Sequence, residues 1–220
     1  MKRRSGVLFG TVIGVAGLFG ISGTLAWWNA WLFFAVMMLI GGFTQRLINT
    51  SPGLAEERKT AAEKAKPWDL KLVRLINLAL PAMLVAAALD VRFRWTFNVP
   101  APVSIAAFFM MVLSAIFTFR AIAANHFFSS HVRIQQDRGQ VVVSSGPYGI
   151  VRHPGYAGSI FFNLLAPLAL GSWGTLLLGA GTAMLLVYRT AREDRVLMEE
   201  LPGYAEYSTQ VRYRLAPGMW

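Results

Sequence analysis

Long apolar segments alternate with short polar segments along this chain. The apolar segments cover residues 6–26, 27–48, 70–89, 103–124 and 156–188. A helix needs about 20 mostly apolar residues to cross a bilayer, and each of the first four segments meets that length. The first two are joined by Trp27-Trp28-Asn29-Ala30-Trp31, an aromatic turn typical of a membrane interface. The pattern therefore predicts membrane-spanning helices.

The last apolar segment, residues 156–188, is too long for one span and is interrupted by Gly171-Ser172-Trp173-Gly174. This break favours two helices joined in a tight hairpin. We therefore expect an all-α fold, a polytopic transmembrane helical bundle of five to six spans that includes this C-terminal hairpin. Pro81 lies inside the third span, where a membrane helix tolerates it as a kink.

The N-terminus allows a second interpretation. The basic head Met1-Lys2-Arg3-Arg4, followed by apolar residues up to Ala26, is also the pattern of a cleaved signal peptide. The apolar segment is long, however, and the chain turns directly into a second one. We therefore favour a helical hairpin that stays in the membrane.

Composition supports a membrane protein. Hydrophobic residues make up 55% of the 220 residues and charged residues only 15%, whereas a soluble domain has about 25% charged residues. An ordinary soluble globule and a disordered chain are therefore excluded. The chain has no cysteine, which also excludes disulfides, thiolate metal sites and palmitoyl anchors.

The basic residues indicate an orientation. The formal net charge is +10, and with six spans and both termini inside, only Arg92 and Arg94 fall on the outer side. This bias obeys the positive-inside rule and predicts a multi-pass protein of a bacterial-type inner membrane with cytosolic termini. Because the basic residues are dispersed over several inner loops, the lipid bilayer is the expected partner and nucleic acid is not. The oligomeric state stays open.

The polar segments divide the chain into two parts. Residues 1–124 hold the N-terminal transmembrane helices with a cytosolic loop at 49–69, and residues 125–220 form a C-terminal half that contains the hairpin. The loop carries charges of both signs at helical spacing, including Glu56 to Lys59, which is typical of a solvated helical loop. The C-terminal half is dense in His, Gln, Arg and Tyr outside the hairpin, so we expect the chemistry there, on the cytosolic side.

The spacing of the charged residues and histidines does not by itself define a functional site. Arg189 and Glu193 are four residues apart and share a helical face, which by itself fits a surface ion pair at the membrane boundary. His126 and His131 are five apart and do not share a face, with only Asp137 nearby. No metal site is expected.

A set of ordered motifs resembles a known family. The motifs are Gly146-Pro147-Tyr148, then Val151-Arg152-His153-Pro154-Gly155-Tyr156-Ala157-Gly158, then Arg189-xxx-Glu193-Asp194 beyond the hairpin, and last Tyr204-Ala205-Glu206-Tyr207. In this order they are similar to the isoprenylcysteine carboxyl methyltransferase family and its phospholipid methyltransferase relatives. The resemblance covers residues 125–217. The N-terminal spans carry no comparable motif.

The resemblance implies an integral-membrane enzyme that uses S-adenosylmethionine, with the cofactor held in a cytosolic pocket of the C-terminal half. It implies catalytic roles for Arg189 and Glu193, with Arg189 binding the substrate. Gln140 stands where eukaryotic members of the family have His. The residues implied to bind the cofactor are Gln135, Gln140, Val141, Val142, Val143, Tyr148, His153, Pro154, Gly155, Tyr156 and Glu193.

The residue chemistry agrees with this implication. Methyl transfer from a sulfonium requires a protein that binds, aligns and excludes water, and a cationic cofactor suits an acidic residue beside aromatic rings. We expect carboxyl O-methylation of a lipophilic, isoprenylcysteine-like acceptor, because an arginine fork binds a carboxylate. The alternatives are N-methylation of a phospholipid amine, S-methylation of a small thiol, and a non-catalytic membrane protein that retains the fold.

Overall fold

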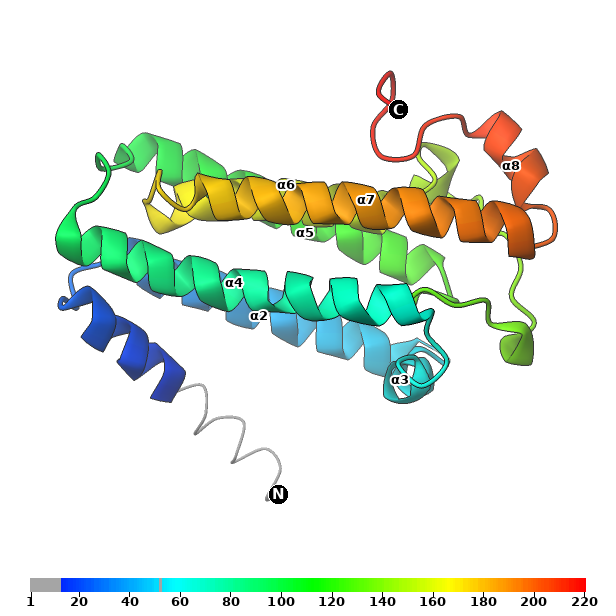
Figure 1. Ribbon diagram of the computed structural model, residues 1–220, viewed down its shortest axis with the longest axis horizontal. Coiled ribbons are helices and arrows are strands. Elements are labelled where there is room, and N and C mark those ends of the chain that lie inside the picture. The colour runs from blue at the N-terminus through cyan, green and yellow to red at the C-terminus, as the bar shows by residue number, and fades with distance from the viewer. Residues whose placement is uncertain (1–12, 52) are drawn as a thin grey trace.

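The computed structural model describes residues 13–51 and 53–220, and the regular structure of these residues is helical (Figure 1). A short helix, Ile13–Ser22, comes first. Two single 3-10 turns, η1 at Gln136–Arg138 and η2 at Gly146–Gly149, lie between the longer helices. The remaining helices are α2 Trp28–Thr50, α3 Leu54–Thr60, α4 Pro67–Phe93, α5 Ala101–Ala124, α6 Pro154–Leu170, α7 Leu176–Glu200 and α8 Tyr204–Gln210.

Within the described residues, three helices are long and apolar enough to cross a membrane: α2, α4 and α5. They coincide with the spans expected at 27–48, 70–89 and 103–124, and Pro81 is accommodated within α4. The expected first span at 6–26 begins outside the described residues, and its described part is the short helix Ile13–Ser22. The all-helical class and the integral-membrane character are thus supported, while the count of five to six spans stays a prediction.

The predicted C-terminal hairpin is formed by α6 and α7, which pack against each other. Two glycines allow α6 to pack closely on both neighbours. A Cβ at Gly158 would lie 2.1 Å from Oγ1 of Thr118 in α5, and one at Gly179 would lie 2.5 Å from the carbonyl oxygen of Asn163. Larger residues at these positions would push α5, α6 and α7 apart.

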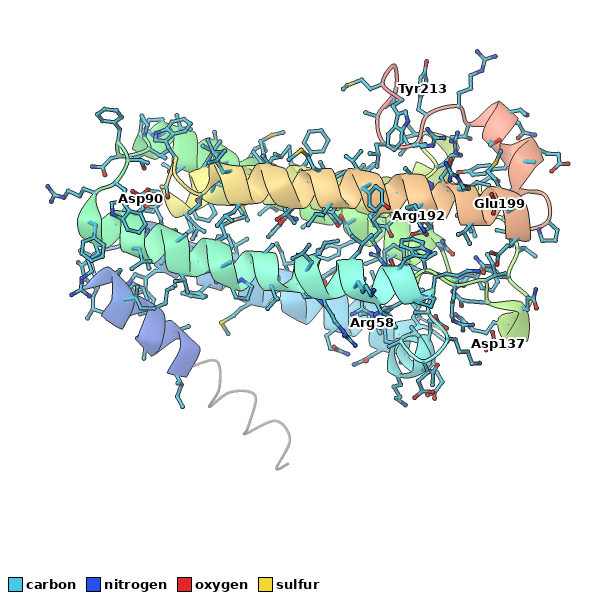
Figure 2. All side chains as sticks on the ribbon, viewed as in Figure 1. Arg58, Asp90, Asp137, Arg192, Glu199 and Tyr213 are labelled. Atoms are coloured by element: carbon cyan, nitrogen blue, oxygen red, sulfur yellow. The ribbon has the colours of Figure 1, made fainter. Side chains whose placement is uncertain are left out.

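The apolar core occupies one end of the bundle. Its largest fully buried side chains include Phe33, Met83, Met111 and Leu170, which come from α2, α4, α5 and α6. At this end the buried carboxylate of Asp90 accepts a hydrogen bond from Ser172 of the hairpin turn at 2.5 Å. Asp90 therefore ties α4 to the hairpin at the end of the bundle remote from Asp137 and Glu199, as Figure 2 shows.

The expectation that residues 49–69 form a solvated helical loop was wrong for two of its charges. Glu57 in α3 is 2% exposed and Asp69 in the first turn of α4 is fully buried. Glu57 pairs with Arg133, and Asp69 pairs with Arg189. The alternating charges of the loop fit a surface helix, but two carboxylates face the C-terminal half, where buried guanidinium groups balance them.

Candidate functional site

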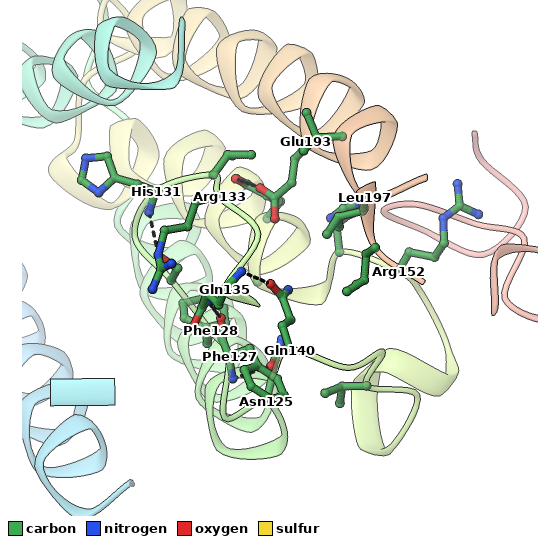
Figure 3. Close-up of a pocket in the computed structure, with 18 of the residues that line it drawn as sticks. Asn125, Phe127, Phe128, His131, Arg133, Gln135, Gln140, Arg152, Glu193 and Leu197 are labelled. Carbon is green, nitrogen blue, oxygen red and sulfur yellow. Dashed lines mark hydrogen bonds between the residues drawn. The ribbon is translucent and has the colours of Figure 1, made fainter. Parts of the chain in front are cut away.

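A cavity of about 360 Å³ lies at the end of the bundle opposite the apolar core, within the range of roughly 300–1,000 Å³ typical of small-molecule sites. Its walls come from the segment between α5 and α6, from one face of α6, from α7 and from α8 (Figure 3). Ile76 of α4 also contributes. The cavity therefore belongs mainly to the C-terminal half, with Ile76 as the lining residue from the N-terminal half.

Most residues implied by the motifs are brought together around this cavity. The exception is Pro154, a buried first residue of α6 that does not line it. The implied residues that line the cavity are Gln135, Gln140, Val141, Val142, Val143, Tyr148, His153, Gly155, Tyr156, Arg189 and Glu193.

Helix periodicity explains why α6 and α7 each present a row of residues to the cavity. Gly155, Ser159 and Asn163 recur every fourth residue along α6 and lie on one face. Arg189 and Glu193 are likewise one turn apart on α7. Pro154 at the first position of α6 is suited to a helix start, because its missing N–H would have no partner there.

Gln135 and Gln140 shape the loop wall. The backbone N–H of Gln135 donates to Oε1 of Gln140 at 2.7 Å, as drawn in Figure 3. The side-chain amide of Gln135 donates to the carbonyl oxygen of Phe127 at 2.6 Å, and its Oε1 accepts from Arg138 at 2.5 Å. The Gln135 side chain, 1% exposed, is thus engaged in ordering residues 127–140.

Asp194 is the centre of a buried network behind the cavity wall. Its carboxylate accepts two bonds from Arg152 and one from Arg214, and Nε2 of His153 lies 2.9 Å from its Oδ1. The hydroxyl of Tyr204 also donates to Oδ1 at 2.9 Å. Burial and then the charge of Asp194 raise the pKa of Tyr204 above its ordinary value, so this phenol stays a donor. The network locks the C-terminal segment onto α6 and α7.

Tyr148 is held from two sides. Its hydroxyl accepts a hydrogen bond from the amide of Asn125 at 3.2 Å, and its carbonyl oxygen accepts one from the hydroxyl of Tyr207 at 2.6 Å. Burial raises the pKa of Tyr207 to about 12 and raises the pKa of Tyr148 as well. Both phenols are therefore neutral near pH 7, and Tyr207 packs α8 against the cavity as a short amphipathic helix would.

Arg189 and Glu193 do not form the surface ion pair that their spacing suggested. Arg189 binds Asp69, with Nε 2.6 Å from Oδ1 and Nη2 3.0 Å from Oδ2. Its guanidinium carbon lies 5.3 Å from the centre of the Tyr156 ring. Glu193 contacts the same tyrosine: its Oε2 accepts a hydrogen bond from the Tyr156 hydroxyl at 2.5 Å.

Glu193 is distinguished by its electrostatic situation. The cavity-lining arginines Arg133, Arg152 and Arg189 are each paired with a carboxylate. Among the described residues, Glu193 has no basic group within 4.0 Å, the distance that defines an ion pair. Figure 3 shows it pointing from α7 toward the side of the cavity that carries Gln140. A carboxylate in this setting favours a cationic ligand.

Three carboxylates of the site were not predicted as site residues from the sequence. Asp194 stands within a recognised motif, but its role as the centre of a network was not inferred. Asp69 and Glu57 bind Arg189 and Arg133 across 120 and 76 residues of chain, respectively, and no local pattern connects such partners. Within residues 13–51 and 53–220, no group of three or more His, Asp or Glu side chains is arranged to hold a metal ion.

Comparison with known proteins finds one similarity, to a protein family. Residues 105–199 match the sequence model of the Isoprenylcysteine carboxyl methyltransferase (ICMT) family. The matched region contains most of α5, all of α6 and nearly all of α7, and therefore most of the cavity wall. The match confirms the family resemblance found in the motifs. No curated protein matches the chain.

Proposed function

We propose that this protein, whose residues 105–199 match a family of membrane methyltransferases, is an S-adenosylmethionine-dependent methyltransferase that modifies a lipophilic acceptor. Carboxyl O-methylation of an isoprenylcysteine-like acceptor is the favoured reaction. We infer that the termini and the cavity face the cytosol, where a water-borne cofactor and a bilayer-borne acceptor meet.

The observation that carries this proposal is the carboxylate of Glu193 beside Tyr156, which no basic group of the described residues neutralises. S-adenosylmethionine bears a sulfonium and an ammonium, so it is matched by a carboxylate and by aromatic faces that attract cations. The other carboxylates around the cavity are already balanced by guanidinium groups. The residues present therefore fit this cofactor, with Glu193, Tyr148 and the backbone of 140–143 as the groups that would hold it.

The chain's own contribution to the reaction is alignment and the exclusion of water. When bound, S-adenosylmethionine supplies a methyl group that is already electrophilic. Arg189 orients the acceptor group, and the buried phenols and apolar walls keep water out of the line of displacement. A carboxylate acceptor arrives deprotonated, so the cavity needs no general base for O-methylation.

The proposed place for the lipophilic part of the acceptor is the inner end of the cavity. Ile76, Ser159, Asn163 and Leu186 line the cavity and lie nearer the apolar core along α4, α6 and α7 than the motif residues do. An acceptor that diffuses within the bilayer would place its tail there and its reactive group near Arg189.

One contact favours a second candidate reaction. Because Asp69 neutralises Arg189, the cavity offers less attraction to an anionic acceptor than a free arginine would. N-methylation of a phospholipid amine or S-methylation of a small thiol therefore stays an alternative, as does a non-catalytic protein that retains the fold.

The test is binding followed by transfer. Detergent-purified protein is titrated with S-adenosylmethionine by calorimetry, and labelled cofactor is then offered with a farnesylcysteine derivative, phosphatidylethanolamine or an alkyl thiol. We expect saturable binding and label in the carboxyl methyl ester. Label in the amine or the thiol would replace the acceptor assignment, and a folded sample without binding at millimolar cofactor would remove the enzymatic function.

A further inference from the structure

A fully buried carboxylate of the N-terminal half, that of Asp69 at the start of α4, contacts the cavity-lining Arg189. Its Oδ1 accepts a hydrogen bond from Nε of Arg189 at 2.6 Å. Its Oδ2 accepts one from Nη2 of Arg189 at 3.0 Å and one from the backbone N–H of Val132 at 2.8 Å. Asp69 therefore holds both α7 and the loop wall of the cavity.

The donors of Arg189 can be counted. A guanidinium has five N–H donors, one on Nε and two on each Nη. Nε binds Asp69, and Nη2 divides its two donors between Asp69 and the carbonyl oxygen of Ser130 at 2.9 Å. Nη1 makes no hydrogen bond to any described residue. In a side chain that lines the cavity, Nη1 is the part left for a ligand.

This geometry differs from one in which the Arg189 guanidinium binds the acceptor through two parallel hydrogen bonds. The two-pronged edge formed by Nε and Nη2 is already engaged by Asp69, and a second two-pronged contact would require Nη2 to leave Ser130. Asp69 also cancels the charge of Arg189, since the pair is buried and its atoms are in direct contact. A single donor group, aimed by Asp69 and backed by the Tyr156 ring, is what Arg189 presents.

We propose that Asp69 is a positioning residue: it fixes Arg189 so that Nη1 alone contacts the methyl acceptor. The proposal rests on the methyltransferase function proposed above. It assigns to a residue of the N-terminal half an indirect part in acceptor recognition, exerted through Arg189. Asp69 itself touches neither the acceptor nor the cofactor.

The first experiment compares Asp69→Asn with Asp90→Asn. Both variants neutralise a buried, hydrogen-bonded carboxylate of α4, but Asp90 lies at the other end of the helix and does not line the cavity. We expect Asp69→Asn to lower kcat/KM for the acceptor by about 100-fold, the effect of a misplacement near 1 Å, with cofactor affinity unchanged. Asp90→Asn should keep both constants. Full acceptor turnover in a folded Asp69→Asn protein would overturn the proposal.

A second arm separates positioning from a merely structural role. In an Arg189→Ala background, Asp69→Asn should have no further effect on acceptor KM or kcat, because Asp69 acts through Arg189. The double variant leaves no buried charge unpaired, so it also serves if Asp69→Asn alone does not fold. An additional loss in the double variant would assign Asp69 a role independent of Arg189 and contradict the proposal.

A third arm does not depend on activity. Phenylglyoxal modification of Arg189, located by peptide mass spectrometry, should be faster in Asp69→Asn than in the wild type or in Asp90→Asn. An unchanged rate would show that Asp69 does not restrain Arg189. If the wild type binds no cofactor, the proposed function and the role of Asp69 both fail, whereas normal binding with an unaffected Asp69→Asn removes Asp69 alone.

Discussion

Glu57 and Arg133 form a buried, two-point ion pair between α3 and the loop wall of the cavity. Nε of Arg133 lies 2.9 Å from Oε1 of Glu57, and Nη2 lies 2.5 Å from Oε2. Ser129 adds a hydrogen bond to Oε1 at 2.8 Å. A helix that looked like a solvated connection therefore clasps the segment that lines the proposed cofactor site.

Glu57→Gln should destabilise this clasp. Removing one partner of a buried ion pair leaves the other charge uncompensated, at a cost of about 3–5 kcal/mol. The measurement is hydrogen exchange of residues 127–140, which should open more readily in the variant, together with the thermal midpoint in detergent. Glu56→Gln is the matched control, because the Glu56–Lys59 pair is 70% exposed on both sides and such pairs contribute little. Equal effects of the two variants would show that the Glu57–Arg133 pair does not hold residues 127–140 in place.

The same pair predicts a dependence on pH. Burial alone would raise the pKa of Glu57, but the hydrogen bonds from Arg133 and Ser129 outweigh it and lower the pKa below 4.5. A carboxyl whose folded pKa is depressed contributes stability above its unfolded pKa and loses it as the pH falls through the folded value. The difference in thermal midpoint between wild type and Glu57→Gln should therefore be constant above pH 4.5 and shrink at lower pH. A difference that grows on acidification would contradict this sign.

Variants at Glu193 and Tyr156 should separate the contribution of the carboxylate charge from that of the phenol hydroxyl in cofactor binding. Glu193→Gln removes a charge-assisted contact worth about 1.5–3 kcal/mol, so the dissociation constant for S-adenosylmethionine should rise by about 10-fold or more. Tyr156→Phe keeps the ring and removes only the hydroxyl that donates to Glu193, so its effect should be smaller. Calorimetry on both variants measures this order, and the reverse order would transfer the main role to the hydroxyl.

Arg189→Lys tests the acceptor contact. A lysine ammonium can neutralise Asp69, but as a point charge it cannot bind Asp69 and the acceptor with separate groups. We expect cofactor affinity to be retained and turnover of a carboxylate acceptor to fall by about 10- to 100-fold. Steady-state kinetics beside calorimetry provide the two readouts. Full turnover of the carboxylate acceptor with unchanged cofactor binding would show that Arg189 does not make the acceptor contact.

The orientation in the membrane can be tested with single cysteines, because the native chain has none. Phe97, 92% exposed in the connection between α4 and α5, and Ser145, exposed before η2, mark the two ends of the bundle. The neighbouring Thr96 is a less suitable position for a cysteine, because its hydroxyl donates a hydrogen bond to Asp90. An impermeant maleimide added to intact cells should label Phe97→Cys and leave Ser145→Cys unlabelled until the membrane is opened. The opposite pattern would place the cavity outside.

Local composition was sufficient to predict the long helices. The apolar segments at 27–48, 70–89 and 103–124 predict α2, α4 and α5 because the bilayer demands a minimum apolar length, a property of consecutive residues. The break at Gly171 to Gly174 likewise predicts the hairpin, since glycine and polar residues end an apolar helix locally. The motif order was sufficient to indicate the family.

The partners of the buried charges were decided by the tertiary structure. The sequence shows Arg189 beside Glu193 on one helical face, but the fold pairs Arg189 with Asp69 and leaves Glu193 to Tyr156. Opposite charges pair when they are close in space, and the packing of α4 against α7 brings Asp69 next to Arg189 although 120 residues separate them in the chain. The sequence by itself therefore determined which segments enter the membrane and which residue types could bind a cationic cofactor. Only the packing of the helices decided which cavity carboxylate has no basic partner among the described residues. An unpaired charge is costly in a low-dielectric interior, so the carboxylates pair with the basic groups that the packing brings near them.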